Sequence, residues 1–323
     1  MSEARACAHP NIAFIKYWGN ADESLRLPAN PSLSMNIDGF LTETTVRWDR
    51  RLTSDELTLN GERAEGDVLA RVSNHLSVIR KLGRFNSFAA VDSTNNFPMG
   101  AGIASSASAF AALTVAACAA GGLSLTEREL TTIARLGSGS ASRSIPPGFV
   151  EWHAGTSHDE SYAESFASQD HWDLVDAIAI ISREHKHVTS QRGHGTAWTS
   201  DFQRARVAGS QERLERCKRA IYERDFSTFA EVVELDSNLM HAVMMTSKPP
   251  LFYWQPPSLA VMEQVRMWRA EGIHVCYTMD AGPNVHCICL QEDSDTVAQR
   301  LNNMAGVKVV HKAGVGGGAG LLA

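Results

Sequence analysis

A run of small residues constrains the fold of this chain more than any other segment. Residues 98–122 are mostly glycine, alanine and serine, and residues 105–118 contain no helix breaker. This composition predicts a helix that is buried on all sides, ended by Gly121. Before it, Gly100 and Gly102 let backbone amides approach an anion at the positively polarised N-terminus of the helix. The pattern suits a phosphate-binding turn, but a tight turn before a closely packed helix explains it equally well.

Two serine-rich segments extend this pattern. Ser105 and Ser106 add hydroxyl donors at the start of the predicted helix, and either one is a candidate magnesium ligand. The segment is not a Walker motif, because no lysine follows the second glycine. In residues 135–144, serine and glycine alternate before Arg143, so hydroxyls, bare amides and a planar guanidinium could clamp a phosphate or a carboxylate. Taken alone, that loop is better explained as flexible, with a solvated arginine.

A lysine within an apolar segment is the third unusual feature. Lys16 lies inside residues 11–19, which have the composition of a strand, and a lysine there is costly unless its ammonium group has a partner. Asp280, in the sharp turn of residues 280–284, is a candidate partner, although spacing alone does not show that the two meet. Otherwise Lys16 would be an edge lysine that reaches solvent, and Asp280 an ordinary turn aspartate.

Helix and strand patterns are mixed along the chain without strict alternation, which predicts an α+β fold. Strands are expected at residues 34–37, 42–48, 57–62, 88–91, 175–182, 273–279 and 285–290. Helices are expected at residues 65–82, at 105–118, after a capping box of Ser124 and Glu127, at 210–245 and at 258–271. Residues 183–205 are polar and are expected to form a mobile connection between two domains, residues 1–185 and residues 186–323.

Composition excludes several classes of protein. With 44% hydrophobic and 20% charged residues, the chain has the balance of a globular protein rather than of a disordered one. Its net charge of -6 does not favour nucleic acid or an anionic membrane as a partner. The six cysteines form no C-x-x-C pair, and no apolar run is long enough to cross a bilayer. We therefore expect a cytoplasmic protein with reduced thiols and no bound nucleic acid or membrane.

Eight short segments together resemble the diphosphomevalonate decarboxylase family, which belongs to the superfamily of galactokinase, homoserine kinase, mevalonate kinase and phosphomevalonate kinase. They follow the order of the family and span nearly the whole chain: residues 11–19, 59–61, 95–98, 104–108, 135–144, 148–152, 161–164 and 279–284. The resemblance implies a two-lobed small-molecule kinase-type fold, with a ribosomal-protein-S5-like N-terminal lobe that binds ATP and a ferredoxin-like C-terminal lobe. It places the active site in the cleft between the lobes, and it implies ATP, magnesium and often a homodimer.

The resemblance also implies roles for individual residues. Asp280 would be the catalytic aspartate with Lys16 beside it, Arg143 would hold the substrate carboxylate, and Asn11 would orient the transferred phosphoryl group. The remaining expected roles fall into two groups. Residues that contact the phosphorylated mevalonate would be Tyr17, Ser138, Ser140, Arg143 and Arg192, and residues that cradle the ATP phosphates would be Gly100, Gly102, Ser105 and Ser106.

The chain departs from the family at a position that bears on the substrate. Relatives that act on a diphosphate usually have a lysine directly after Tyr-Trp-Gly, where this chain has Asn20. Gln191 also stands where some bacterial relatives have an arginine, although Arg192 could compensate. One missing charge-assisted contact would weaken diphosphate binding by about 1.5–3 kcal/mol. The sequence therefore favours 5-phosphomevalonate as substrate and isopentenyl phosphate as product, with 5-diphosphomevalonate and isopentenyl diphosphate as the alternative.

Two further alternatives use the same scaffold. One is a kinase that phosphorylates the 3-hydroxyl of mevalonate without decarboxylation, and the other is a catalytically inactive small-molecule sensor. Kinases of that kind lack the aspartate–lysine pair, whereas this chain has both Asp280 and Lys16. A sensor would be expected to have lost catalytic positions first. The retained residues therefore favour a decarboxylase.

Overall fold

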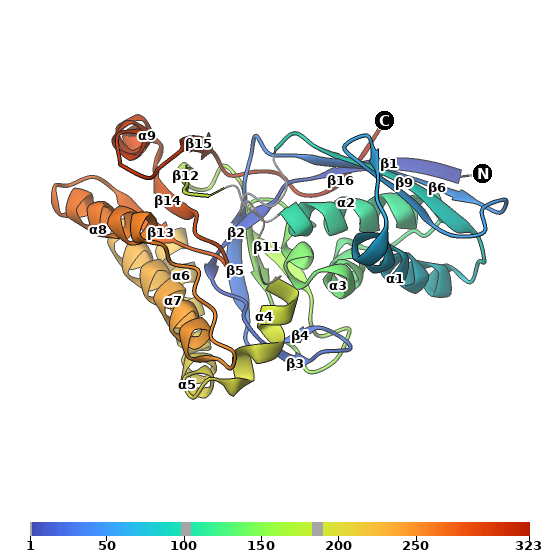
Figure 1. Ribbon diagram of the computed structural model, residues 1–323, viewed down its shortest axis with the longest axis horizontal. Coiled ribbons are helices and arrows are strands. Elements are labelled where there is room, and N and C mark those ends of the chain that lie inside the picture. The colour runs from blue at the N-terminus through green and yellow to red at the C-terminus, as the bar shows by residue number, and fades with distance from the viewer. Residues whose placement is uncertain (1, 98–104, 183–189) are drawn as a thin grey trace.

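The computed structural model describes the chain except residues 1, 98–104 and 183–189. A six-stranded sheet with three helices on one face forms the first lobe (Figure 1). Its strands, in spatial order, are β16 Gly320–Leu322, β1 Ser2–Ala8, β6 Thr42–Asp49, β9 Phe88–Asn95, β7 Glu56–Leu59 and β8 Glu62–Arg63. The helices are α1 Gly66–Gly83, α2 Ser105–Ala120 and α3 Glu127–Gly137. The alanines of α2 are almost all buried against β1 and β6, since small side chains let helix and sheet approach closely.

Two four-stranded sheets complete the architecture. The second sheet has the order β11 Ala163–Ala167, β10 Phe149–Trp152, β5 Ser32–Asn36 and β2 Asn11–Ile15. The third has the order β13 Val275–Thr278, β14 Val285–Leu290, β12 Leu174–Ile180 and β15 Val309–Ala313, and a short hairpin joins β3 Asn20–Asp22 to β4 Leu27–Pro28. All the pairings within these two sheets are antiparallel.

The remaining helices connect and cover these sheets. They are α4 Ser190–Thr196, α5 Gln203–Ala208, α6 Ser210–Glu223, α7 Phe226–Thr246, α8 Pro256–Ala270 and α9 Ser294–Asn302, with short 3₁₀ turns η1 Gly139–Ser144, η2 Ala197–Thr199 and η3 Gln291–Asp293. Helix α6 packs on β2 and β5, and α7 packs on both β2 and β13, so these helices lie where the second and third sheets meet. A core cluster there combines side chains of both sheets, such as Phe14 and Ile288, with Phe229 of α7.

The chain passes between the sheets more than once. Strand β12 pairs with β14 and β15, although it precedes residue 185 in the sequence. At the other end of the chain, β16 pairs with β1, which brings the two termini to the same side of the molecule (Figure 1). The division into domains at residue 185 remains a prediction. The glycine-rich tail gave no sign of β16, because this strand depends on pairing with a distant partner.

Most predicted elements are present, and several differ from the prediction in their bounds or type. Helix α3 starts two residues later than expected, because Thr126 and Glu129, rather than Ser124 and Glu127, form the capping box. The expected loop after α3 is the 3₁₀ helix η1. Beyond the undescribed residues 183–189, the connection expected at residues 183–205 is largely helical, and its mobility remains a prediction. The expected helix at residues 210–245 is two helices, since Asp225 caps the start of α7.

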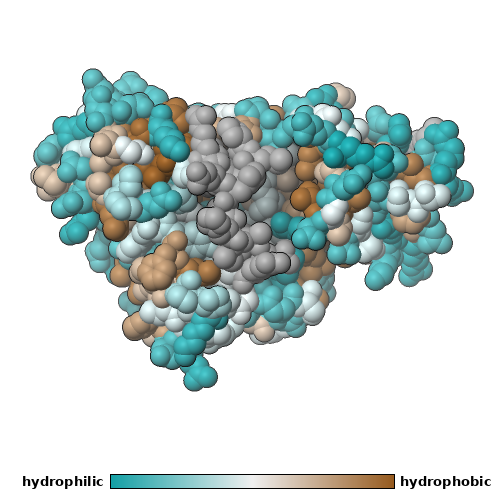
Figure 2. All heavy atoms as spheres, in the orientation of Figure 1, coloured by the Kyte–Doolittle hydropathy of each residue, from teal (hydrophilic) through white to brown (hydrophobic). Residues whose placement is uncertain are grey.

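The surface is mixed rather than strongly apolar on the face shown in Figure 2. Hydrophilic side chains cover much of both ends of the molecule, and hydrophobic ones gather in small separated patches (Figure 2). Within the described residues, no helix is both long enough and apolar enough to span a bilayer.

Candidate functional site

Lys16 and Asp280 form an ion pair at the junction of the second and third sheets. Lys16 directly follows β2, rather than lying within the strand as expected, and Asp280 follows β13. Lys16 Nζ donates to Asp280 Oδ1 at 2.7 Å, and the side chains are 1% and 32% exposed. Burial lowers the pKa of Lys16, and the charge of Asp280 opposes this shift. The contact that spacing could not establish is present, so neither residue is an ordinary surface side chain.

Arg143 is held by a buried network rather than by solvent. Its side chain is 3% exposed. Nε donates to Asn11 Oδ1 at 3.2 Å, and Nη1 donates to Ser32 Oγ at 2.7 Å. Burial lowers the pKa of Arg143 to about 10, against the opposing charges of Asp280 and Tyr17. Arg143 therefore stays a cation at neutral pH, and the explanation of its segment as a flexible, solvated loop is wrong.

Serine hydroxyls converge beside this network. Asn11 Nδ2 donates to the carbonyl of Ser140 at 3.1 Å, which links β2 to η1. Ser138 Oγ lies 3.4 Å from Ser140 Oγ and 3.5 Å from Ser106 Oγ in the first turn of α2. Ser105 is the first residue of α2. The two serine-rich segments thus meet in space, with hydroxyls from α2 and from the end of α3 facing one another.

Tyr17 closes one side of the serine cluster. Its ring packs on Gly139 so tightly that a Cβ there would lie 2.6 Å from the ring, which explains the glycine. The Tyr17 hydroxyl donates to Asn20 Oδ1 at 2.5 Å, and Asn20 Nδ2 donates to Glu23 Oε2 at 2.8 Å. Both ends of the Asn20 amide are therefore engaged. Burial raises the pKa of Tyr17, so its phenol stays protonated, and the ring of His194 stacks on it at 4.1 Å.

Three predicted site residues have no described side-chain geometry. Gly100 and Gly102 lie outside the described residues, and of Arg192 only the backbone, in α4, is described. Their roles stay predictions, as does the choice between Ser105 and Ser106 as a magnesium ligand. The structure brings most of the other predicted residues into one connected group: Asn11, Lys16, Tyr17, Ser106, Ser138, Ser140, Arg143 and Asp280. Ser105 lies beside Ser106 at the start of α2, and its role stays a prediction.

Two arginines beside this group were missed by the sequence analysis. Arg71 of α1 donates from Nη2 to the carbonyl of Gly137 at 3.0 Å, directly before Ser138. Burial lowers its pKa to about 10, and the positive charge of Arg26 adds to this shift. The backbone of Arg26 adopts the left-handed conformation, with φ of 49°. Neither arginine forms an ion pair with a carboxylate of the described residues. Neither arginine lies in a motif that would identify it as a site residue from the sequence.

A buried acid on α7 was also missed. Asp236 is fully buried, and its Oδ2 accepts the backbone N–H of Lys16 at 2.6 Å. It follows Val232 and precedes Met240 by four residues each, so it lies on the apolar stripe of the helix. In the sequence, the sign that Asp236 has a special role is a charged residue at a position where the helix period predicts an apolar one. The adjacent Ser237 is buried as well and contacts the segment that carries Asp280.

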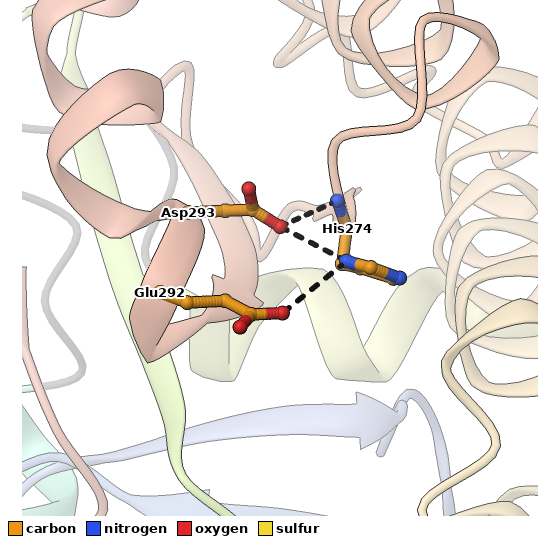
Figure 3. A group of neighbouring side chains, drawn as sticks. All are labelled: His274, Glu292 and Asp293. Atoms are coloured by element: carbon orange, nitrogen blue, oxygen red, sulfur yellow. Dashed lines mark hydrogen bonds and ion pairs between the residues drawn. The ribbon is translucent and has the colours of Figure 1, made fainter.

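A cluster of potential metal ligands lies elsewhere, on the surface. His274, Glu292 and Asp293 come together at the end of β13 opposite Asp280 (Figure 3). Asp293 Oδ2 accepts the backbone N–H of His274 at 2.9 Å and lies 3.0 Å from its Nδ1, so hydrogen bonding accounts for its position. The cluster joins two loops of the third sheet, and we assign it no role in the site around Lys16 and Asp280.

Comparisons with known proteins identify a family for this chain. A model of the diphosphomevalonate decarboxylase-like N-terminal domain matches residues 8–163, and a model of the mevalonate 5-diphosphate decarboxylase C-terminal domain matches residues 177–315. Diphosphomevalonate decarboxylase mvd1 of Aspergillus fumigatus is 39% identical, with 94% of this chain and 80% of its own covered. The diphosphomevalonate decarboxylase of Candida albicans is 38% identical, with 93% and 88% covered.

Solved structures show the same similarity in three dimensions. The mevalonate diphosphate decarboxylase of Staphylococcus aureus superposes with a TM-score of 0.96 at 36% identity, covering 100% of this chain and 98% of its own. MDDEF in complex with MVAPP, AMPPCP and magnesium superposes with a TM-score of 0.95 at 37% identity, covering 99% of each chain. The two-lobed α+β fold is therefore confirmed. With both of its halves matched, this chain belongs to the diphosphomevalonate decarboxylase family.

Proposed function

We propose that this protein uses ATP and magnesium to decarboxylate 5-diphosphomevalonate to isopentenyl diphosphate. The observation that carries the choice of substrate is Arg71, whose guanidinium donates to the carbonyl directly before Ser138 and has no carboxylate partner among the described residues, with the charge of Arg26 acting on it. Like charges held close together are unfavourable unless an anion joins them. A diphosphate would supply that anion, and it brings at least one more negative charge than a monophosphate.

The preference for 5-phosphomevalonate expected from the sequence is less well supported. It depended on Asn20 in place of a lysine, and thus on one missing cation. Arg26, a few residues further along the same hairpin, would supply a cation in this region, since its charge acts on Tyr17. The relatives are diphosphomevalonate decarboxylases by name, which also favours the alternative with two phosphates. We therefore prefer the diphosphate as substrate.

The donor set suits ATP and magnesium. Ser106, in the first turn of α2, and Ser138 present hydroxyls to each other, and a helix N-terminus carries free N–H groups and a positive dipole end. MDDEF, with the same fold, is described as a complex with AMPPCP and magnesium. Ser105, Ser106 and the preceding glycines would hold the phosphates. When bound, magnesium would neutralise the charge on the phosphates during transfer.

Four residues of the site have distinct roles in the proposed reaction. The substrate carries a tertiary hydroxyl beta to a carboxylate, and hydroxide is a poor leaving group. Asp280 would orient the hydroxyl and accept its proton, while Lys16 favours the ionised carboxylate. Arg143 would bind the substrate carboxylate and Asn11 would orient the incoming phosphoryl group. Once the hydroxyl is phosphorylated, the C–O bond breaks, phosphate and carbon dioxide leave, and the alkene remains.

Two further parts of the proposal rest on the family resemblance and on composition. We propose that the protein forms a homodimer, which light scattering on the eluted protein would test. We also propose a cytoplasmic location, because the described structure keeps all six cysteines as free thiols. Cell fractionation would test that location.

The central experiment compares 5-diphosphomevalonate and 5-phosphomevalonate side by side, with ADP and carbon dioxide measured together. We expect both products in equal amounts and a higher kcat/KM for the diphosphate. A higher kcat/KM for the monophosphate would restore the argument from Asn20. ADP without carbon dioxide would indicate a kinase, and neither product would indicate a sensor.

Two variants test whether Arg26 and Arg71 determine the preference for the diphosphate. Arg26→Gln and Arg71→Gln should each lower kcat/KM for the diphosphate by about tenfold or more, the value of one charge-assisted contact. The monophosphate should be affected less. Arg47→Gln is a matched control, because this exposed arginine lies on β6 of the six-stranded sheet. Equal losses for both substrates would show that the arginines do not distinguish the second phosphate.

A further inference from the structure

The backbone of Lys16 is held from both sides by buried groups. Its N–H donates to Asp236 Oδ2 at 2.6 Å. Its carbonyl accepts from Arg206 Nη2 at 2.6 Å and from Asn30 Nδ2 at 3.0 Å. Buried backbone groups outside a regular ladder need partners of this kind. The position of Lys16 after β2 is therefore set by side chains from distant segments.

The residue before Asp280 is held from the same helix. Ser237 Oγ accepts the N–H of Met279 at 3.0 Å and lies 3.5 Å from its carbonyl. Ser237 is the neighbour of Asp236 on α7, and both side chains are almost completely buried, at 1% and 0% exposed. Because α7 packs on both β2 and β13, it reaches the two strands that end at Lys16 and at Asp280.

We propose that Asp236 and Ser237 are positioning residues of the decarboxylation, which hold the backbones of Lys16 and Met279 and so fix the geometry of the Lys16–Asp280 ion pair. In these hydrogen bonds, the side chains of Asp236 and Ser237 contact backbone groups and not the side chains of Lys16 and Asp280. They act through the main chain, one on each partner. This inference rests on the proposed function, because it assigns the pair a role in that reaction.

A purely structural role would predict a different arrangement. Asp236 also accepts from Arg213 Nε at 2.7 Å, and a buried ion pair of this kind is common in protein cores. An aspartate that served only Arg213 would place both oxygens on the guanidinium, in the two-point contact that arginine favours. Here Oδ1 contacts Arg213 and Oδ2 contacts the backbone of Lys16. The carboxylate thus bridges the core ion pair and the catalytic segment.

The expected effect on catalysis follows from how steeply rates depend on orientation. A shift of about 1 Å in a reacting group can cost about a hundredfold in rate. Losing the Ser237 contact would free the turn that carries Asp280, while the groups that bind substrate stay in place. We therefore expect the loss to appear in kcat and to leave KM little changed.

Ser237 provides the sharper test, because its replacement is mild. Ser237→Ala should lower kcat by about tenfold or more with KM for both substrates within about threefold. Ser237→Thr keeps the hydroxyl and adds a methyl group to a tight site, so it should lower Tm while keeping kcat near wild type. Ser247→Ala is the matched control, since this buried serine caps the end of α7 with bonds to Met244 and Pro249. It should lower Tm and leave kcat unchanged.

Several outcomes would overturn the proposal. Wild-type kcat in Ser237→Ala would show that Met279 needs no such support. Equal losses of kcat in Ser237→Ala and Ser247→Ala would show a general effect of destabilising α7. Failure of the proposed function would look different, because it would appear in the wild-type protein, either as no carbon dioxide released from 5-diphosphomevalonate or as a higher kcat/KM for 5-phosphomevalonate.

A second measurement needs no turnover at all. Asp280, Asp236 and Arg143 act on the Lys16 ammonium group, and His286 and His241 interact with its charge as well; Asp236 raises the pKa of Lys16. Asp236→Asn should therefore lower the pKa of Lys16, as measured by NMR of lysine-labelled protein, whereas Ser237→Thr should not. An unchanged pKa in folded Asp236→Asn would contradict the placement of this carboxylate beside Lys16. This result is independent of which substrate the enzyme uses.

Discussion

At the scale of single residues, the site depends on charges that the fold brings together from opposite ends of the sequence. Lys16 and Asp280 are 264 positions apart, yet their side chains share a 2.7 Å hydrogen bond. Burial of Lys16 without this partner would favour its neutral form. The Asp280 carboxylate thus offsets the cost of burying the Lys16 ammonium group.

The first prediction concerns Asp280. Asp280→Asn keeps the shape of the side chain but removes the base and the negative charge beside Lys16. We expect decarboxylation to fall by about a hundredfold or more, as for the loss of a general base, with ATP binding retained. Carbon dioxide release and nucleotide affinity should be measured in the same preparation. Near-normal turnover would remove Asp280 from its assigned role.

The second prediction concerns Arg143. Arg143→Lys keeps the charge, but an ammonium group cannot reach Asn11 and Ser32 while it also makes a planar two-point contact with a carboxylate. We expect kcat/KM to fall by about tenfold to a hundredfold, the value of one charge-assisted contact. Arg50→Lys is a suitable control, because Arg50 is exposed at the end of β6. Unaltered kinetics in Arg143→Lys would show that the guanidinium is not required.

At the scale of elements, periodicity predicted most helices and strands, and the errors occur where tertiary contacts decide. The alanine-rich helix and the helix at residues 65–82 were predicted because their patterns are local. Strand β16 was not, because three residues of a glycine-rich tail become a strand only when β1 is beside them. The turn η1 was expected to be a flexible loop, since its sequence shows neither the burial of Arg143 nor the packing of Gly139.

The same distinction applies to the site. Family resemblance pointed to residues in motifs, such as Asn11 and Asp280, which lie in short and recognisable segments. It did not point to Arg26, Arg71 or Asp236, whose neighbours in sequence are unremarkable. A helix face can be predicted from its apolar period, but the partner of a buried charge on that face comes from another part of the chain. Such partners need three-dimensional coordinates.

The third prediction tests the packing of η1. Gly139→Ala would place a Cβ 2.6 Å from the Tyr17 ring, so either the ring or the turn must move. Overpacking of this kind typically costs about 1–3 kcal/mol. We expect a lower Tm and weaker binding of the phosphorylated substrate, measured by thermal unfolding and calorimetry. Gly195→Ala, in α4, is the control, because a Cβ built there meets no atom within 4 Å among the described residues, apart from its chain neighbours and its own helix. It should leave both properties unchanged or raise Tm slightly.

At the scale of the whole molecule, buried histidines give the fold a defined response to acid. His75 and His241 are almost fully buried, and burial lowers the pKa of each to about 3, with nearby positive charges adding to the effect. His286 behaves in the opposite way, because its pairing with Asp176 at 2.6 Å raises its pKa despite burial. The two kinds of histidine therefore act on stability in different ranges of pH.

The fourth prediction follows from the sign of these shifts. In the unfolded chain a histidine takes up a proton near pH 6.5, whereas His75 and His241 stay neutral in the folded protein until about pH 3. Between these values the unfolded state binds more protons, so stability falls as pH is lowered, by about 1.4 kcal/mol per pH unit for each histidine. His286 is protonated first in the folded state, so its contribution is complete below pH 6.5 and is lost only as pH rises through its raised pKa. It therefore leaves the slope between pH 6 and 5 to His75, His241 and His194, since burial lowers the pKa of His194 to about 3 as well. Denaturant unfolding at a series of pH values should show this slope, and His75→Gln should reduce it by about 1.4 kcal/mol per pH unit.

Arg71 and Arg26 are the charges that act on His75, so the buffer must keep ionic strength constant. An unchanged slope in folded His75→Gln would mean that His75 is protonated in the native state, which would contradict its burial beside Thr114 and Phe110.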